Sequence, residues 1–181
     1  HSIRRRQRQM CIRDRQSNYW EDNFFSKPKM FGLDPSIAAI SSLKKFKDEN
    51  IDEIVELGAG LGRDTIFFAE NKIKVEALDY SPTAIKIIEK KAKENNFSKL
   101  ISTKNFDVRG GLPYEDNSIK GVFSHMLYCM ALTNSDIEKL NNEILRILKP
   151  GGMNIYTVRN FNDGDYMKGA YIGEEMYEND G

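Results

Sequence analysis

The sequence predicts an α/β fold, a doubly wound parallel sheet of about five strands covered by helices on both faces. Apolar runs of strand length alternate with amphipathic segments of helical length from residue 51 to residue 158. The first run leads directly into three glycines, at positions 58, 60 and 62, after which a helix-like segment begins. Strands that alternate with helices in this way pair in parallel through right-handed crossovers.

Length and composition favour a single domain without a membrane segment. The chain has 181 residues, 40% of them hydrophobic, which is enough for one core. No stretch approaches the roughly 18 apolar residues of a membrane span, and the start lacks the apolar core of a signal peptide. Cys11 and Cys129 form neither a disulfide framework nor a metal-ligand pair by spacing. We therefore expect a soluble, cytoplasmic protein without a metal site.

Residues 1–16 stand apart because they hold six arginines and one acid. The rest of the chain holds 21 basic and 26 acidic residues, a net charge of −5. Such a body has no global attraction to nucleic acid, so we expect no nucleic-acid partner. The leader contains MCIRDR, which resembles translated sequencing-adapter sequence. We interpret it as a disordered or non-native extension in preference to a nucleic-acid-binding arm.

Residues 17–50 precede the first strand and divide into an aromatic segment and a helix. The aromatic side chains between positions 19 and 31 must pack on the body of the fold or on a ligand. A helix is predicted to begin after Ser36, with Ile37, Ile40, Leu43 and Phe46 on one face toward the sheet.

Five strands are predicted from residue 51 onward. They cover 51–57, 73–78, 100–106, 119–124 with a possible extension to 128, and 153–158. Helices are expected after the glycines, after Ser81-Pro82 with its capping serine, and over 135–148. The last helix should end at Lys149-Pro150-Gly151-Gly152. The strand order 3-2-1-4-5 follows if the order reverses around the first strand.

The chemistry is expected at the carboxyl ends of the strands, where ligands bind in open parallel sheets. Four strand ends carry polar groups: Glu56, Asp79, Asp107, and the pair Ser124-His125. Asp79, about 20 residues beyond the glycines, is placed to accept bonds from both hydroxyls of a ribose. A dinucleotide fingerprint would place its third glycine at position 63, where this chain has Arg. The pattern therefore favours a ligand with a ribose and no phosphate over a nicotinamide dinucleotide.

The residues resemble the class I S-adenosylmethionine-dependent methyltransferases, which have a Rossmann-like fold. Four stretches carry the resemblance: VELGAGLGRDT, VEALDYSP, FDVRGGLPYEDNSIKGVFS and ILKPGGMNIY. The resemblance implies S-adenosylmethionine as cofactor, with the methionine end beside Gly58, Ala59, Gly60 and Ser124, and with Glu56 orienting the glycine loop or the methionine amine. It implies that Asp79 binds the ribose, and that Tyr80, Asp107 and the Val108 amide meet the adenine. Tyr19, Trp20 and Phe31 are implied to belong to a lid over the cofactor.

For some residues near these motifs a purely structural role is an alternative to ligand binding. Gly62 is better explained by close packing than by ligand contact, and Asp64 in a first helical turn is favourable through the helix dipole alone. His125 is the candidate general base if the acceptor needs one, and Tyr128 and Tyr19 are candidates for shaping the acceptor pocket.

The predicted function is methyl transfer to a small-molecule acceptor that the sequence does not identify. The alternatives are a catalytically silent cofactor-binding or interaction domain and, with less support, an NAD-dependent oxidoreductase. We expect a cofactor-binding core over 51–159 and a polar tail over 160–181. Because the family sheet has seven strands, we also expect the last two to be absent, the fifth to be an open edge, and the chain to be a fragment.

Overall fold

A computed structural model describes residues 16–130, 132–160, 162, 164, 168–173 and 176–178. Nearly all of the leader predicted over 1–16 lies outside these residues. Within them, no helix has both the length and the apolar character needed to cross a membrane.

The centre of the fold is a five-stranded parallel sheet with the order β3-β2-β1-β4-β5. Its strands are β1 (Glu53–Leu57), β2 (Lys74–Asp79), β3 (Ile101–Asn105), β4 (Ile119–Ser124) and β5 (Leu148–Tyr156). The helices are α2 (Ile37–Asp48), α3 (Arg63–Glu70), α4 (Pro82–Glu94) and α5 (Asn134–Ile147). The predicted fold class and strand order are confirmed, and β5 is at the edge of this sheet.

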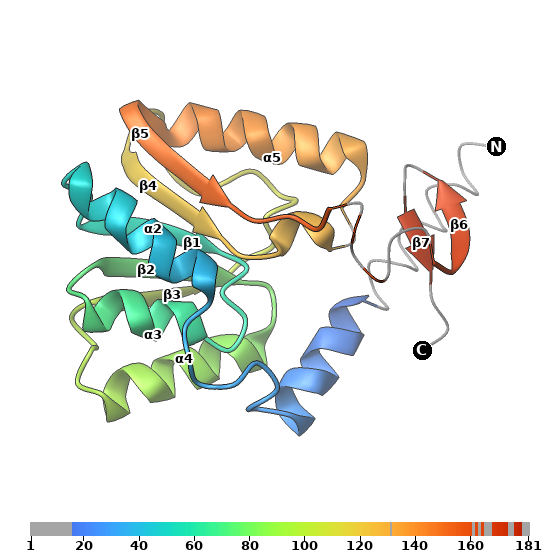
Figure 1. Cartoon of the computed structure of the whole chain (residues 1–181), viewed down its shortest axis with the longest axis horizontal. Coiled ribbons are helices and arrows are strands. Elements are labelled where there is room, and N and C mark those ends of the chain that lie inside the picture. Colours follow the sequence, from blue (N-terminus) through green and yellow to red (C-terminus); the bar gives the residue numbers. More distant parts are fainter. Residues whose placement is uncertain are drawn as a thin grey trace.

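Helices cover both faces of the sheet, as Figure 1 shows. On one face, α2, α3 and α4 pack through Phe46, Phe68 and Ile88. On the other, α5 packs through Leu140, Ile144 and Ile147. Because successive strand residues point to opposite faces, Ile54 of β1 joins the first cluster and Val55 joins the second.

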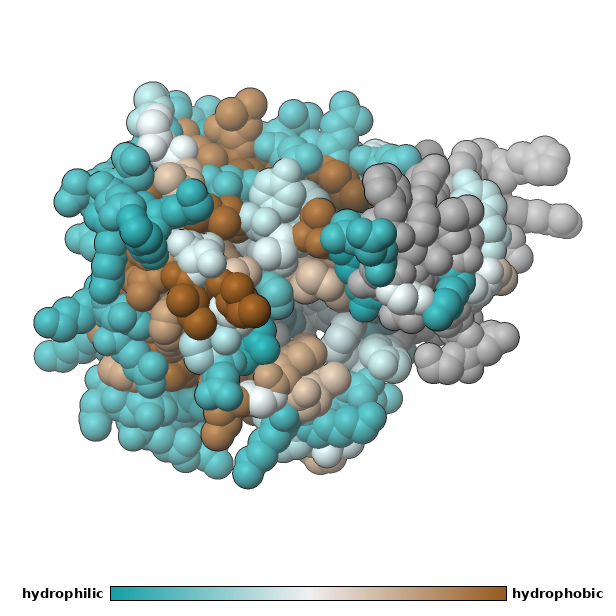
Figure 2. Space-filling view, in the orientation of Figure 1, coloured by the Kyte–Doolittle hydropathy of each residue, from teal (hydrophilic) through white to brown (hydrophobic). Residues whose placement is uncertain are grey.

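The predicted buried face of α2 is wrong at two positions. Ile37 and Ile40 are 84% and 50% exposed, whereas Phe46 is fully buried. A spacing of three advances only about 300° around a helix, so a nine-residue separation places Ile37 opposite Phe46. The face that packs instead carries Ala39, Ser42 and Phe46. Figure 2 shows apolar side chains gathered on the molecular face where α2 lies in Figure 1.

Three further elements differ from the prediction. Residues 16–26 are helical, which was not predicted. β5 begins at Leu148 instead of Met153, because the Lys-Pro-Gly-Gly stretch belongs to the strand and does not form a loop before it. The pairing of β5 with β4 changes register across this stretch. In the stretch predicted as a polar tail, β6 (Ala170–Gly173) and β7 (Met176–Glu178) form a separate antiparallel pair.

Candidate functional site

The glycine loop between β1 and α3 is fastened to the end of β2. The amides of Gly58 and Ala59 both donate to the Leu78 carbonyl, at 2.9 and 3.0 Å. The Gly60 amide donates to Asp79 Oδ2 at 2.8 Å. Gly58 and Gly60 have φ of +71° and +54°, a conformation that glycine adopts without a steric cost. The loop is therefore a shaped backbone surface at the carboxyl ends of β1 and β2.

A cavity of about 320 Å³ opens over this loop. That volume falls in the range of small-molecule sites. Ten of the predicted residues line it: Trp20, Phe31, Glu56, Gly58, Ala59, Gly60, Asp79, Tyr80, Val108 and His125. The structure thus brings into one cavity residues from the N-terminal segment and from the ends of four strands.

Asp79 is buried at the end of β2 and bonded on both oxygens. Oδ2 accepts from the Gly60 amide, and Oδ1 accepts from the Ser81 amide at 2.9 Å. Burial raises the pKa of Asp79 to about 6, against the opposing effect of these two hydrogen bonds from backbone amides. Each carboxylate oxygen has a second lone pair, so the group can still accept bonds from a ligand.

Glu56 is the most perturbed acid of the cavity. Its side chain is 3% exposed, and Oε2 accepts from the Thr65 hydroxyl at 2.5 Å. Burial, together with the nearby Asp64 and Asp79 carboxylates, raises its pKa to about 8 against the opposing effect of the Thr65 hydrogen bond. At neutral pH this carboxyl is mostly protonated, unless a cation enters the cavity beside it.

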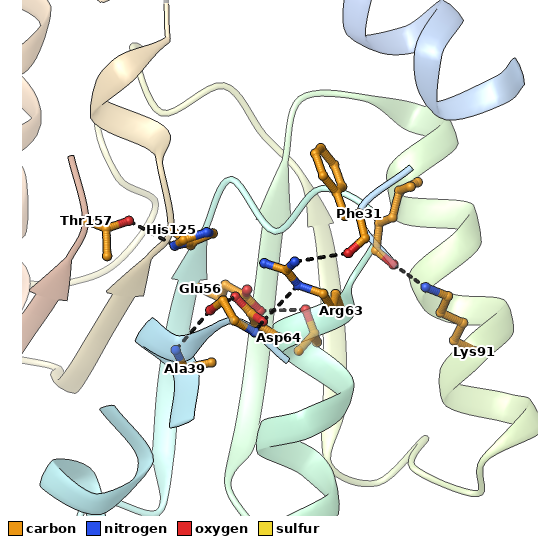
Figure 3. Close-up of polar contacts among 11 residues, drawn as sticks. Phe31, Ala39, Glu56, Arg63, Asp64, Lys91, His125 and Thr157 are labelled. Atoms are coloured by element: carbon orange, nitrogen blue, oxygen red, sulfur yellow. Dashed lines mark hydrogen bonds and ion pairs between the residues drawn. The ribbon is translucent and has the colours of Figure 1, made fainter. Parts of the chain in front are cut away.

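An aromatic cluster from the N-terminal segment covers one side of the cavity. Trp20 packs against Phe24 and Phe31 with ring centroids 5.4 and 6.1 Å apart. Arg63 donates to the Phe31 carbonyl at 3.1 Å, as Figure 3 shows, and so ties this segment to α3. Glu21 accepts bonds from the Ser81 and Thr83 hydroxyls at the start of α4. The cluster is thus attached to two helices of the core.

Four predicted residues lie outside the cavity. Tyr19 is 55% exposed. The Asp107 carboxylate pairs with the Arg109 guanidinium at 2.6 to 2.9 Å. Ser124 is buried, and its hydroxyl has no hydrogen-bond partner among the described residues. The Tyr128 hydroxyl donates to Asn141 Oδ1 at 2.7 Å. Their predicted ligand contacts remain predictions.

Gly62 and Asp64 have structural roles. A Cβ on Gly62 would lie 2.6 Å from Ile88 Cγ1 of α4, so this glycine allows α3 and α4 to pack closely. Asp64 accepts from the backbone amide and the hydroxyl of Ser36, at 2.8 and 2.7 Å. Ser36 in turn caps α2 through the Ala39 amide. Asp64 therefore joins the starts of α2 and α3, a role beyond the dipole effect considered from the sequence.

His125 follows β4 and lines the cavity. Its Nδ1 lies 2.9 Å from the Thr157 hydroxyl, and Figure 3 shows the ring between Thr157 and the region of Glu56 and Arg63. Burial lowers the pKa of His125. This shift favours the neutral imidazole, the form in which one nitrogen donates and the other accepts.

Several lining residues were missed from the sequence, among them Arg63, Phe106, Met126, Leu127, Met130 and Arg159. Residues 126–130 belong to an apolar stretch that allowed a longer strand. The strand ends at Ser124 because Met126 has a left-handed backbone, after which Leu127–Cys129 forms a 3₁₀ turn. Phe106 directly follows β3, and this position at a strand end was the one available signal.

The residues present fit the cofactor that the sequence implied. At Gly60 the glycine loop has no side chain beside the cavity; a Cβ there would approach the rings of Phe24 and Phe31 to 3.7 and 3.9 Å. Glu56 offers a carboxyl to an ammonium, Asp79 offers one to ribose hydroxyls, and Tyr80 and Val108 offer apolar surface to a base.

Comparison with known proteins gives one family. Residues 54–152 match the model of a methyltransferase domain. Phosphoethanolamine N-methyltransferase 1 of Triticum aestivum is 41% identical over 102 residues, which are 55% of this chain and 20% of that protein. A second phosphoethanolamine N-methyltransferase of the same plant is 30% identical over 151 residues, 77% of this chain and 28% of that protein. The chain thus spans only 20% and 28% of the length of these two relatives.

Solved structures share the fold. Phosphoethanolamine N-methyltransferase 1 of Haemonchus contortus, solved with phosphoethanolamine and S-adenosylhomocysteine, has a TM-score of 0.61 at 21% identity, covering 81% of this chain and 32% of that one. A sarcosine dimethylglycine methyltransferase structure from Galdieria sulphuraria has a TM-score of 0.59 at 22% identity, covering 66% and 44%. With the matched domain model and the glycine-loop cavity, these findings show that the chain belongs to the S-adenosylmethionine-dependent methyltransferase family.

Proposed function

We propose that the cavity binds S-adenosylmethionine and that the protein transfers its methyl group to a small-molecule acceptor. The observation that carries this proposal is the joint position of Glu56, the glycine loop and Asp79 along one cavity. An acid at one end suits the methionine ammonium, and an acid at the other suits the ribose.

The cofactor supplies an electrophilic methyl group on a sulfonium. The residues of this chain would contribute mainly by positioning, which in well-oriented reactions lowers barriers by about 7 to 11 kcal/mol. Asp79 and the Gly60 amide, already bonded to each other, would fix the ribose end. The rings of Trp20, Phe24 and Phe31 would exclude water from one side of the cavity.

Phosphoethanolamine is the first acceptor to test. Its support is the identity to the two wheat phosphoethanolamine N-methyltransferases. The assay is methyl transfer from labelled S-adenosylmethionine to phosphoethanolamine, with ethanolamine as the matched acceptor without phosphate. Cofactor binding without transfer to any amine acceptor would favour the binding-domain alternative.

Cofactor binding is tested by calorimetric titration with S-adenosylhomocysteine and, separately, with NAD. Asp79→Ala should weaken S-adenosylhomocysteine binding by about 1.5 to 3 kcal/mol, because charge-assisted bonds to the ribose are lost. Asp48→Ala is the matched control, since Asp48 is an exposed acid of α2 that pairs with Lys44. Tight binding of NAD, or an unchanged affinity in Asp79→Ala, would contradict the proposal.

A further inference from the structure

The Thr157 hydroxyl lies between two groups of the segment that follows β4. Its oxygen accepts from the Met126 amide at 2.9 Å, and it lies 2.9 Å from Nδ1 of His125. Thr157 itself is fixed by the sheet, because its amide donates to the Ser124 carbonyl at 3.2 Å, one residue beyond the β4–β5 ladder. Thr157 directly follows β5, and this bond ties its backbone to the last residue of β4.

The Met126 amide occupies one lone pair of this hydroxyl and cannot receive its proton. A backbone N–H can only donate, so the Thr157 oxygen must act as acceptor toward it. Met126 has φ of +61°, an uncommon conformation for a residue with a side chain. The hydrogen bond from its backbone N–H to the Thr157 hydroxyl helps to hold this conformation. The hydroxyl proton of Thr157 then needs an acceptor, and Nδ1 of His125 is the one that the described contacts provide.

A neutral imidazole that accepts at Nδ1 carries its proton on Nε2. Burial lowers the pKa of His125, which favours the neutral ring; the charged groups that act on it are Asp64 and Arg63. Asp64 is occupied by the Ser36 amide and hydroxyl, and Arg63 by Asp64 and the Phe31 carbonyl. Neither is bonded to the ring.

We propose that Thr157 fixes His125 in the Nε2–H tautomer, so that His125 presents a hydrogen-bond donor to the cavity and acts as a ligand-positioning group, not as a general base. This inference rests on the proposed function for the identity of the ligand, and it replaces the base role considered from the sequence. Thr157 is the positioning residue. The group that receives the bond is an anionic oxygen, supplied either by the amino-acid carboxylate of the cofactor or by the methyl acceptor.

The tautomer is measured in the free protein by nuclear magnetic resonance of histidine labelled with heavy nitrogen. The chain has two histidines, and the His125 signals are assigned by their loss in His125→Gln. The expected result is an unprotonated Nδ1 and a protonated Nε2 in the wild type and in Thr157→Ser. Thr157→Val should give a mixture of tautomers. A protonated Nδ1 in the wild type would overturn the proposal.

The source of the oxygen is found by adding ligands to the same sample. A shift of the Nε2 proton signal with S-adenosylhomocysteine but not with methylthioadenosine, which lacks the amino-acid group, identifies the cofactor carboxylate. A shift that needs phosphoethanolamine in addition identifies the acceptor. No shift with any of them, while calorimetry shows S-adenosylhomocysteine bound, would overturn the donor role.

Two substitutions separate a donor from a base in the reaction. The side-chain amide of Gln reaches the place of Nε2–H, whereas that of Asn reaches the place of Nδ1. A donor role predicts that His125→Gln keeps most of the binding or transfer and that His125→Asn loses about tenfold or more. A base role predicts that both lose it. Failure of S-adenosylhomocysteine to bind the wild type would refute the proposed function. The tautomer measured in the free protein would still decide whether Thr157 fixes His125 in the Nε2–H form.

Discussion

Replacing Glu56 by Gln should change how the stability of the protein depends on pH. Glu56 is buried, and its pKa in the folded protein is about 8 against an ordinary value of 4.5. The folded state therefore keeps a proton that the unfolded state loses above pH 4.5. The stability contributed by this group is complete below the unfolded pKa and is lost as the pH rises toward the folded pKa.

The magnitude follows from that window. Each pH unit between the two pKa values costs the wild type about 1.4 kcal/mol. Gln cannot ionise, but its amide oxygen can still accept from the Thr65 hydroxyl. Glu56→Gln should therefore gain stability over the wild type by about 3 kcal/mol between pH 5 and pH 7.5, and the gain should level off above about pH 8.

Urea unfolding of both proteins at each pH gives this difference directly, because groups other than Glu56 contribute nearly equally to both. Glu53→Gln is the matched control, since Glu53 lies on the same strand with a side chain that is 62% exposed beside Lys74. Its difference from the wild type should not change with pH. A flat curve for Glu56→Gln would show that Glu56 is ionised in the folded protein, and the reasoning would be refuted.

Three other substitutions test the packing and the covering segment. Gly62→Ala should lower the free energy of unfolding by about 2 to 4 kcal/mol, because it adds a clash with Ile88 to backbone strain. Its control is Gly151→Ala, where φ is similar and the space around the residue is open, so that only the backbone strain of about 1 to 2 kcal/mol should be lost. Phe46→Ala should cost about 3 to 5 kcal/mol and the exposed Ile37→Ala less than about 0.5, and comparable losses would contradict the observed face of α2. Glu21→Ala should speed S-adenosylhomocysteine dissociation by about tenfold, since the bonds to Ser81 and Thr83 are lost; equal rates in Glu21→Ala and in the exposed neighbour Asp22→Ala would contradict a role for this contact.

The sheet was predictable from the sequence because short strand candidates alternate with amphipathic helices, although β3 (ISTKN) has a single apolar residue. The five strands and the capping residues Ser36 and Ser81 were all visible there. The face of α2 was not, because apolar residues three apart wind around a helix, and only the neighbouring elements decide which of them are buried. The helix over 16–26 was missed since its aromatic residues have no simple period and its support comes from distant Ser81 and Thr83.

The candidate site was predictable where it depends on backbone geometry, and less so where it depends on contacts between side chains. The glycine loop, Glu56 and Asp79 lie in the cavity because strand ends meet at one edge of the sheet. Asp107 lies two residues beyond the end of β3, and its carboxylate accepts from the guanidinium of Arg109. The Thr157 contact with His125 joins residues 32 apart in the chain, and no local sequence pattern predicts it.

The fastening of the glycine loop has a consequence for the thermodynamics of ligand capture. Three successive amides are bonded within the protein, two to the Leu78 carbonyl and one to Asp79. A ligand that enters finds a preorganised wall and loses little free energy to ordering it. The conformational entropy that binding does remove should therefore fall on the aromatic segment around Trp20 and Phe31. Affinity in this protein is then adjustable through residues remote from the reacting atoms, by making that segment stiffer or looser.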